Sequence, residues 1–263
     1  MADHAFRLGY TTSSWGYTPD MEAVLGTIRA AGFDGVECNR ISAAWIGTPT
    51  RARALYERHG LVPVATLDDI GVTSEERPKG LERLRRIIEW GAEVGQSIFC
   101  LVGPARVGQR LPTDDEFKRL AEETEALIDT AEPLGITVTY HAHPGCVVEA
   151  EDEQDRLLSF APRLKVCLDA SVSGFMQEDP VAQVRKYRDR VAYVHMKDWT
   201  RGKFCILGRG TIGLDYPAFL AALTEIDYTG WVMTELSGAA DTGAEESCQS
   251  NAEYLRSIGY GRA

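Results

Sequence analysis

The sequence predicts a single (β/α)₈ TIM barrel, an α/β fold in which residues 1–263 form one domain. Three observations predict it. Short apolar runs alternate with amphipathic helical stretches eight times along the chain. The length of 263 residues is close to the roughly 250 of a closed barrel. No Pro/Gly/Ser-rich linker divides the chain, and an open doubly wound sheet is the main alternative.

Each predicted strand is a short run of apolar and β-branched residues, bounded by glycine or by polar residues. Strict alternation with helices implies parallel strands joined by right-handed crossovers. The spacing of the runs suits βαβ units of roughly 30 residues or more. The predicted strands are Phe6–Ser14, Gly35–Asn39, Leu61–Leu67, Ile98–Val102, Ile136–His141, Lys165–Asp169, Val191–Met196 and Trp231–Leu236.

The predicted helices carry apolar residues at a spacing of three and four, as Leu81, Leu84 and Ile88 do. Start signals support several of them, such as the capping box at Thr113–Glu116 and the proline in the first turn at Pro180. The predicted helices are Met21–Ala31, Pro49–His59, Gly80–Val94, Thr113 to about Pro133, Glu151–Phe160, Pro180–Arg188, Tyr216–Thr224 and Ala244–Ser257.

The composition limits the partners that we expect. A formal net charge of -11 repels phosphate backbones, and the cluster Arg83, Arg85 and Arg86 is typical of a solvated helix face, so we expect no nucleic-acid partner. The six cysteines form no CxxC pair, which fits a reducing compartment. No signal core or membrane-length apolar run is present. We therefore expect a soluble cytoplasmic protein that does not bind membranes.

Polar residues follow the apolar runs at the points where predicted strands end. In a closed barrel these ends meet at one rim, where the function of the fold gathers. Three of the five histidines of the chain lie there. Each residue alone is more often a helix cap or a solvated side chain. The strand-end residues are Glu37, His141, His143, Asp169, His195, Lys197 and Glu235.

Imidazole nitrogens and carboxylate oxygens on neighbouring strand ends can meet around one ion. Together, the residues that follow the fifth to the eighth strand predict a divalent-metal site. Such a mixed set of nitrogen and oxygen donors suits transition metals better than Mg²⁺. We expect Mn²⁺ or Co²⁺, with Zn²⁺, Fe²⁺ and Mg²⁺ as alternatives.

The segment Gly208–Gly213 matches the GxGxxG pattern of dinucleotide-binding proteins. It does not directly follow a strand, and it lies late in the chain, so the Rossmann context is missing. We interpret it as a flexible loop over the site and expect no dinucleotide.

The order of these motifs resembles the sugar isomerase/epimerase superfamily of xylose-isomerase-like barrels, and most closely its inosose (2-keto-myo-inositol) dehydratase branch. The resemblance covers nearly the whole chain. It is carried by the motifs Tyr140-His141-Ala142-His143 with Gly145 and Glu149, Leu168-Asp169, His195-Met196-Lys197-Asp198, Leu207-Gly208-Arg209-Gly210 and Gly230-Trp231 with Glu235.

The resemblance implies a metal held by one residue from each of strands five to eight. Asp169, His195 and Glu235 match the last three positions directly. At the strand-five position His141 replaces the glutamate of many members, so either His141 or Glu149 is the ligand; we favour Glu149. Asp169-Ala170-Ser171 also replaces the frequent Asp-Thr-Gly-His, which puts the substrate in doubt more than the metal.

The implied chemistry is proton abstraction next to a carbonyl of a sugar or cyclitol, with an enediolate stabilised by the metal. His141 or His143 would be the acid and base, because a pKa near neutral suits both roles. Lys197 would stabilise enolate charge. Glu37 would bind a hydroxyl or act as a second base.

Three functions follow from these observations. The first is a metal-dependent lyase of the dehydratase type, acting on a keto-cyclitol or keto-sugar. The second is a sugar isomerase or epimerase with the same metal site. The third is a sugar-binding protein or partner subunit with vestigial chemistry. A homo-oligomer is compatible with all three.

Overall fold

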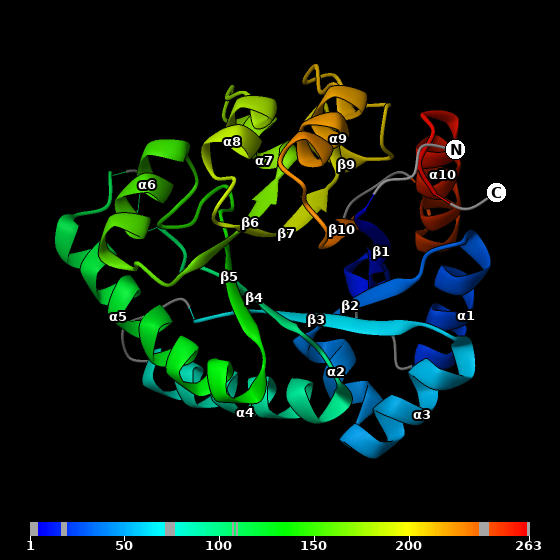
Figure 1. Cartoon of the computed structure of the whole chain (residues 1–263), viewed down its shortest axis with the longest axis horizontal. Helices are drawn as coiled ribbons and strands as arrows, with labels where there is room; N and C mark the ends of the chain where they lie inside the picture. The colour runs from blue at the N-terminus through cyan, green and yellow to red at the C-terminus, as the bar shows by residue number, and fades with distance from the viewer. Residues whose placement is uncertain are drawn as a thin grey trace.

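The computed structural model describes residues 5–16, 20–71, 77–106, 108, 110–236 and 242–261, and it shows a closed barrel of parallel strands. Around the barrel the strand order is β1-β10-β7-β6-β5-β4-β3-β2. The helices surround the strands on the outside (Figure 1). The barrel strands are β1 Arg7–Thr11, β2 Gly35–Asn39, β3 Val62–Asp69, β4 Ile98–Val102, β5 Thr137–His141, β6 Lys165–Asp169, β7 Val191–Met196 and β10 Trp231–Thr234.

The predicted single TIM barrel is confirmed, with modest shifts at the strand ends. β1 ends at Thr11 because the Thr11 side chain accepts a hydrogen bond from the Ser13 backbone and starts the short helix η1 Thr12–Trp15. β3 continues to Asp69, where its last residues pair with Leu101 and Val102 of β4. The longer β3 includes two carboxylates at its end, Asp68 and Asp69, which lie beyond the predicted strand.

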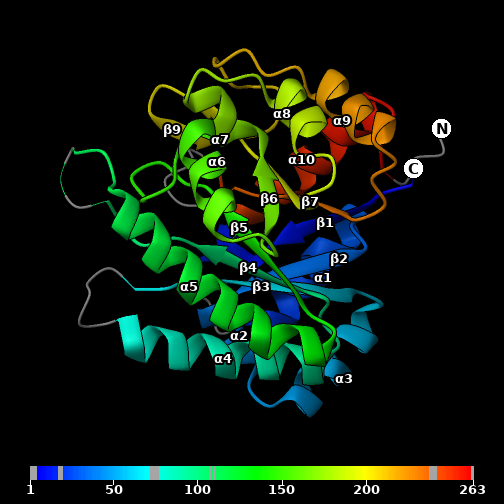
Figure 2. The same ribbon diagram turned by 60° about the vertical axis from the view of Figure 1, so that its left-hand side comes forward.

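The predicted helices all occur, and further short elements lie at the rim. α4 and α5 pack side by side against β3 to β5 (Figure 2). The helices are α1 Met21–Ala31, α2 Arg40–Ile46, α3 Pro49–His59, α4 Arg77–Val94, α5 Asp114–Ala131, η2 Glu132–Leu134, α6 Glu151–Phe160, α7 Ala170–Phe175, α8 Pro180–Lys186, α9 Tyr216–Glu225 and α10 Ala244–Ser257. Among the residues described, no helix is long and apolar enough to cross a membrane.

The unpredicted helices α2 and α7 begin directly after strands because the last strand residue caps them. Asn39 accepts hydrogen bonds from the backbone of Ile41 and Ser42. Asp169 accepts one from the backbone of Ser171. Such capping satisfies the otherwise unpaired amides of a first turn. A hairpin after β7, formed by β8 Asp198–Thr200 and β9 Lys203–Cys205, was also not predicted.

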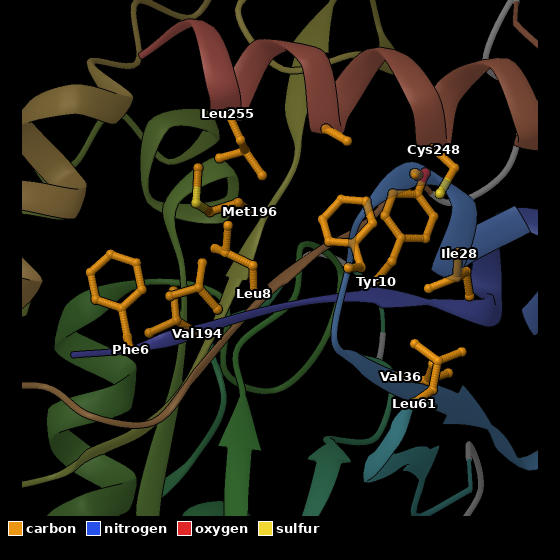
Figure 3. Packing of buried hydrophobic residues seen from close by; sticks show 14 of the residues in the cluster. Phe6, Leu8, Tyr10, Ile28, Val36, Leu61, Val194, Met196, Cys248 and Leu255 are labelled. Atoms are coloured by element: carbon orange, nitrogen blue, oxygen red, sulfur yellow. The ribbon is translucent and has the colours of Figure 1, made fainter. Parts of the chain in front are cut away.

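The apolar core lies mainly between the barrel and its helices. Figure 3 shows Tyr10 of β1 and Val194 of β7 packing beneath Cys248 and Leu255 of α10. A smaller cluster, which includes Val64, Cys100 and Met233, fills the barrel interior. This interior packing closes the barrel below the rim, and the carboxyl ends of the strands place the predicted site residues above it.

Two helical glycines test how closely the outer helices approach the strands. A Cβ at Gly80 of α4 would overlap the carbonyl oxygen of Ile70, whereas one at Gly26 of α1 would lie 3.6 Å from His59. We expect Gly80→Ala to lower the free energy of unfolding by about 1–3 kcal/mol. The control Gly26→Ala should raise it by up to about 1 kcal/mol, because alanine favours helices. Urea unfolding measures both, and a stabilised Gly80→Ala protein would contradict the close packing.

Candidate active site at the carboxyl ends of the strands

Six of the predicted site residues form one buried cluster at the rim of the barrel. The parallel register brings them together, since Asp169 of β6 pairs with His195 of β7. Every member is at most 6% exposed, which is unusual for charged side chains. The cluster consists of Glu37, His141, Asp169, His195, Lys197 and Glu235.

His195 lies between two carboxylates at the centre of the cluster. Its Nε2 is 2.9 Å from Glu37 Oε2, and its Nδ1 is 3.3 Å from Glu235 Oε2. The second contact is an ion pair without hydrogen-bond geometry, so Nδ1 has no hydrogen-bond partner among the described residues. Burial opposes protonation, but the negative charge of Glu37 and the contacts with the Glu37 and Glu235 carboxylates outweigh it and hold the pKa of His195 well above its usual value.

Lys197 lies between Glu235 and one further carboxylate, that of Asp169. Its Nζ lies 3.0 Å from Asp169 Oδ2 and 3.0 Å from Glu235 Oε2. Burial would raise the pKa values of both carboxyls, but the Lys197 charge lowers them well below their usual range. Burial would likewise lower the pKa of Lys197, and the two carboxylates raise it instead. A positive charge therefore already lies where these two carboxylates converge.

His141, which ends β5, and His143, two residues later, differ in their surroundings. His141 is buried, and its Nε2 lies 3.0 Å from Asp169 Oδ2. Burial lowers the pKa of His141 to about 4. His143 is partly exposed, and its Nδ1 lies 3.1 Å from the carbonyl oxygen of Pro144. Because a carbonyl oxygen only accepts, Nδ1 carries the proton in that hydrogen bond and the lone pair lies on Nε2.

The donor atoms suit a metal ion, with one change from the expected ligand set. Atoms of His141, Asp169 and His195 lie within 4.8 Å of one another. Glu149 lies outside this group: its Oε1 is 3.1 Å from Arg106 Nη1, and its Oε2 accepts a hydrogen bond from the Gly145 backbone. The geometry thus favours His141, the alternative, over Glu149, because the Glu149 carboxylate is bound by Arg106 and by the turn after β5 and lies outside this group of donor atoms.

Glu37 also lies elsewhere than its expected role requires. Its side chain is fully buried, and its Oε2 faces His195. A carboxylate behind the second nitrogen of an imidazole orients that ring and fixes its tautomer. The position suits a residue that orients His195, and it does not suit one that binds a hydroxyl or removes a proton from a substrate.

An open pocket of about 400 Å³ leads from the rim to the cluster. The residues that line it include His141, His143 and Glu235, together with Asn39, Arg40, Asp68 and Asp69. A volume of this size lies in the range of small-molecule sites. Asn39 ends a predicted strand, but Arg40, Asp68 and Asp69 were not among the predicted site residues, although the pair Asp68-Asp69 after an apolar run is a signal that points to these two.

The glycine-rich segment after β9 is an ordered turn held by Asp198. Asp198 Oδ2 accepts hydrogen bonds from the backbone of Gly208 at 3.0 Å and of Gly210 at 2.9 Å. A Cβ at Gly210 would overlap the Asp198 carboxylate. The glycines therefore allow a close approach of backbone to carboxylate. This explains the GxGxxG match without a dinucleotide, and it shows a hydrogen-bonded turn within the segment expected to be a loop.

The low pKa of His141 predicts a pH dependence of stability in the metal-free protein. The pKa falls from 6.5 in the unfolded chain to about 4 in the folded one, so the unfolded chain takes up the proton first. Protonation of His141 in the unfolded chain therefore lowers the free energy of unfolding as the pH falls from 6.5 towards 4.

The variant His141→Asn lacks this titrating group. We expect its free energy of unfolding to fall less between pH 7 and pH 4.5 than that of the unchanged protein, as measured by urea unfolding at both values. An NMR titration that places the His141 pKa near 6.5 would contradict this prediction.

Comparison with known proteins identifies the family. The model of the xylose isomerase-like TIM barrel family matches residues 25–258. An inosose dehydratase of Geobacillus kaustophilus is 28% identical over 88% of this chain and 87% of its own length. Two solved structures share the fold: the 3-keto-D-glucoside 4-epimerase YcjR of E. coli (TM-score 0.80, 20% identical, 96% of this chain and 99% of that one) and the IOLI protein with a zinc atom (TM-score 0.81, 17% identical, 96% and 98%). The chain belongs to the xylose isomerase-like TIM barrel family.

Proposed function

We propose that the protein is a divalent-metal-dependent lyase of the dehydratase type that acts on a keto-cyclitol or keto-sugar. The observation that carries the proposal is His195: its Nε2 is held by Glu37, and its Nδ1 faces Glu235 and the remaining donors without a hydrogen-bond partner among the described residues. A metal-binding imidazole shows this arrangement, with one nitrogen oriented by a carboxylate and the other facing the ion. The similarity to an inosose dehydratase supports the reaction type.

The charges of the cluster also suit a divalent ion. Three carboxylates, those of Glu37, Asp169 and Glu235, face two cations, Lys197 and a protonated His195, which leaves one negative charge. Exchange of the His195 proton for a divalent ion would bring the sum to zero, which favours binding in a buried site. His141, Asp169, His195 and Glu235 would hold the ion. Imidazole and carboxylate donors suit Mn²⁺, Co²⁺, Zn²⁺ or Fe²⁺ better than Mg²⁺.

When bound, the metal would polarise the substrate carbonyl and so acidify the neighbouring C–H group. His143 lines the pocket and carries a lone pair on Nε2, so it would accept the α-proton. The protonated His143 would then donate this proton to the departing β-hydroxyl, and water would leave. Lys197 supplies the positive charge nearest to Asp169 and Glu235, and would offset the negative charge of the enolate.

A metal-dependent sugar isomerase or epimerase is the second candidate. His141 and His143 lie together, with ring centroids 5.8 Å apart, and both line the pocket. In this candidate His143 would remove a proton at one carbon and return it at the neighbouring carbon, while His141 stays with the metal. The two candidates differ in their products, because a dehydratase releases water and an isomerase or epimerase conserves the mass of the substrate.

The first experiment measures metal content by elemental mass spectrometry, followed by a product screen with 2-keto-myo-inositol and 3-keto-sugars. We expect about one transition metal per chain and a product lighter by one water. Asp169→Asn, which preserves the helix cap, should lose the metal, and His143→Ala should keep the metal but lose turnover by about 10²–10⁴-fold. The surface variant His59→Ala is the matched control. A metal-free protein, even after soaking, would overturn the proposal.

Lys197 provides a second test, because its ammonium lies where two of the proposed ligands converge. A divalent ion must share or displace this charge. We therefore expect Lys197→Met to bind Mn²⁺ at least about tenfold more tightly than the unchanged protein.

Calorimetric titration of the metal-free proteins at pH 7 measures this difference directly. The metal-free variant should also be less stable and should regain stability with metal. Weaker binding by Lys197→Met would show that Lys197 supports the metal site and does not compete for it.

A further inference from the structure

A groove beside the active-site pocket points to a substrate larger than one sugar or cyclitol ring. We propose that this groove holds a negatively charged, ring-bearing substituent of the substrate, so that the substrate is a conjugate of a keto-sugar or keto-cyclitol. This inference rests on the proposed function, and it deepens that function by naming the substrate class.

The groove lies between α2 and α4 on the outside of the barrel and has a volume of about 820 Å³. Trp45 of α2 is 48% exposed in it, a large value for a tryptophan. Trp90 of α4 also lines it and is held in place by a 2.7 Å hydrogen bond from its Nε1 to the Gly47 carbonyl oxygen. Two indole rings that face one groove form a wall on which a planar ring can pack.

The charge of the groove is opposite to that of the protein as a whole. The chain has a formal net charge of -11, yet the described residues that line the groove include lysine and arginine side chains and no carboxylate. Lys79 is exposed and forms no ion pair with another described residue. Within the part of the chain that the structure describes, Arg86 forms one ion pair, with Glu82 at 3.2 Å on the helix surface, and such an exposed pair has little strength. Both cations are therefore available to an anionic group.

The groove and the active-site pocket are neighbours that share two lining residues, Arg40 and Ile41. Arg40 is fixed at this boundary by ion pairs to Asp68 at 3.1 Å and Asp69 at 3.2 Å. The pocket of about 400 Å³ is large enough for a sugar ring, whereas the groove is larger and combines apolar side chains with cations. A ligand with a sugar at one end and a charged ring at the other would fill both.

The experiment uses 4-carboxyphenyl β-D-glucopyranoside, which combines a sugar, a benzene ring and a carboxylate. It has no keto group, so it binds without turnover. Its affinity for the purified protein, from tryptophan fluorescence and calorimetry, is compared with those of methyl β-D-glucopyranoside and 4-hydroxybenzoate. We expect the conjugate to bind at least tenfold more tightly than either part.

The variants locate this gain in affinity. Lys79→Glu combined with Arg86→Glu should remove the gain for the conjugate and leave the affinity for methyl glucoside unchanged. Arg85→Glu is the matched control, because Arg85 lies on the same helix and does not line the groove. It should bind the conjugate as the unchanged protein does.

Three outcomes would overturn the inference. In the first, the conjugate and methyl glucoside bind equally. In the second, 4-hydroxybenzoate binds as tightly as the conjugate, which indicates a separate anion site. In the third, sedimentation shows a dimer that the Trp45→Ala substitution dissociates but the conjugate leaves intact, which indicates that a second copy of the chain occupies the groove. Failure of the proposed function is distinguishable, because it would abolish turnover of keto-substrates while the gain for the conjugate remained.

Discussion

The buried contact between Glu37 and His195 is the constraint on which the rest of the site depends. Both side chains are fully buried, and such charges are costly unless they are paired. The pair fixes which nitrogen of His195 faces the other donors, and thereby where Glu235 and Lys197 can lie. A barrel with a packed interior supports this arrangement, because apolar side chains such as Val64 and Met233 close the space beneath it.

The sequence predicts the barrel and most of the cluster for the same physical reason. A parallel register sends the residue that ends each strand to one rim, so Asp169 and His195 meet without any knowledge of side-chain packing. Glu149 could not be placed in this way. Its position depends on an ion pair with Arg106, which lies far from it in the sequence, in the loop after β4. The role of Glu37 likewise depends on which side of His195 it approaches, and strand spacing alone does not determine this.

The elements that were not predicted depend on single side chains that accept hydrogen bonds from nearby backbone amides. Asn39 ends β2 and caps α2, and the hairpin after β7 leads into a turn held by Asp198. The GxGxxG match therefore reflects the room needed beside one carboxylate. Helix α2, which Asn39 caps, forms one wall of the groove beside the active-site pocket. The cap at the end of β2 therefore also shapes the surroundings of the pocket.

Asp169 has a consequence for how this family evolves. Its Oδ1 accepts hydrogen bonds from the backbone of Ser171 at 2.8 Å and from the Ser171 hydroxyl at 2.7 Å, while its Oδ2 faces His141 and Lys197. One carboxylate thus starts a helix with one oxygen and belongs to the ionic cluster with the other. A descendant that lost its activity would still be selected to keep Asp169 for folding. The Glu37 and His195 side chains bond to no backbone group of the described residues, so their replacement is the better mark of a lineage that has lost the chemistry.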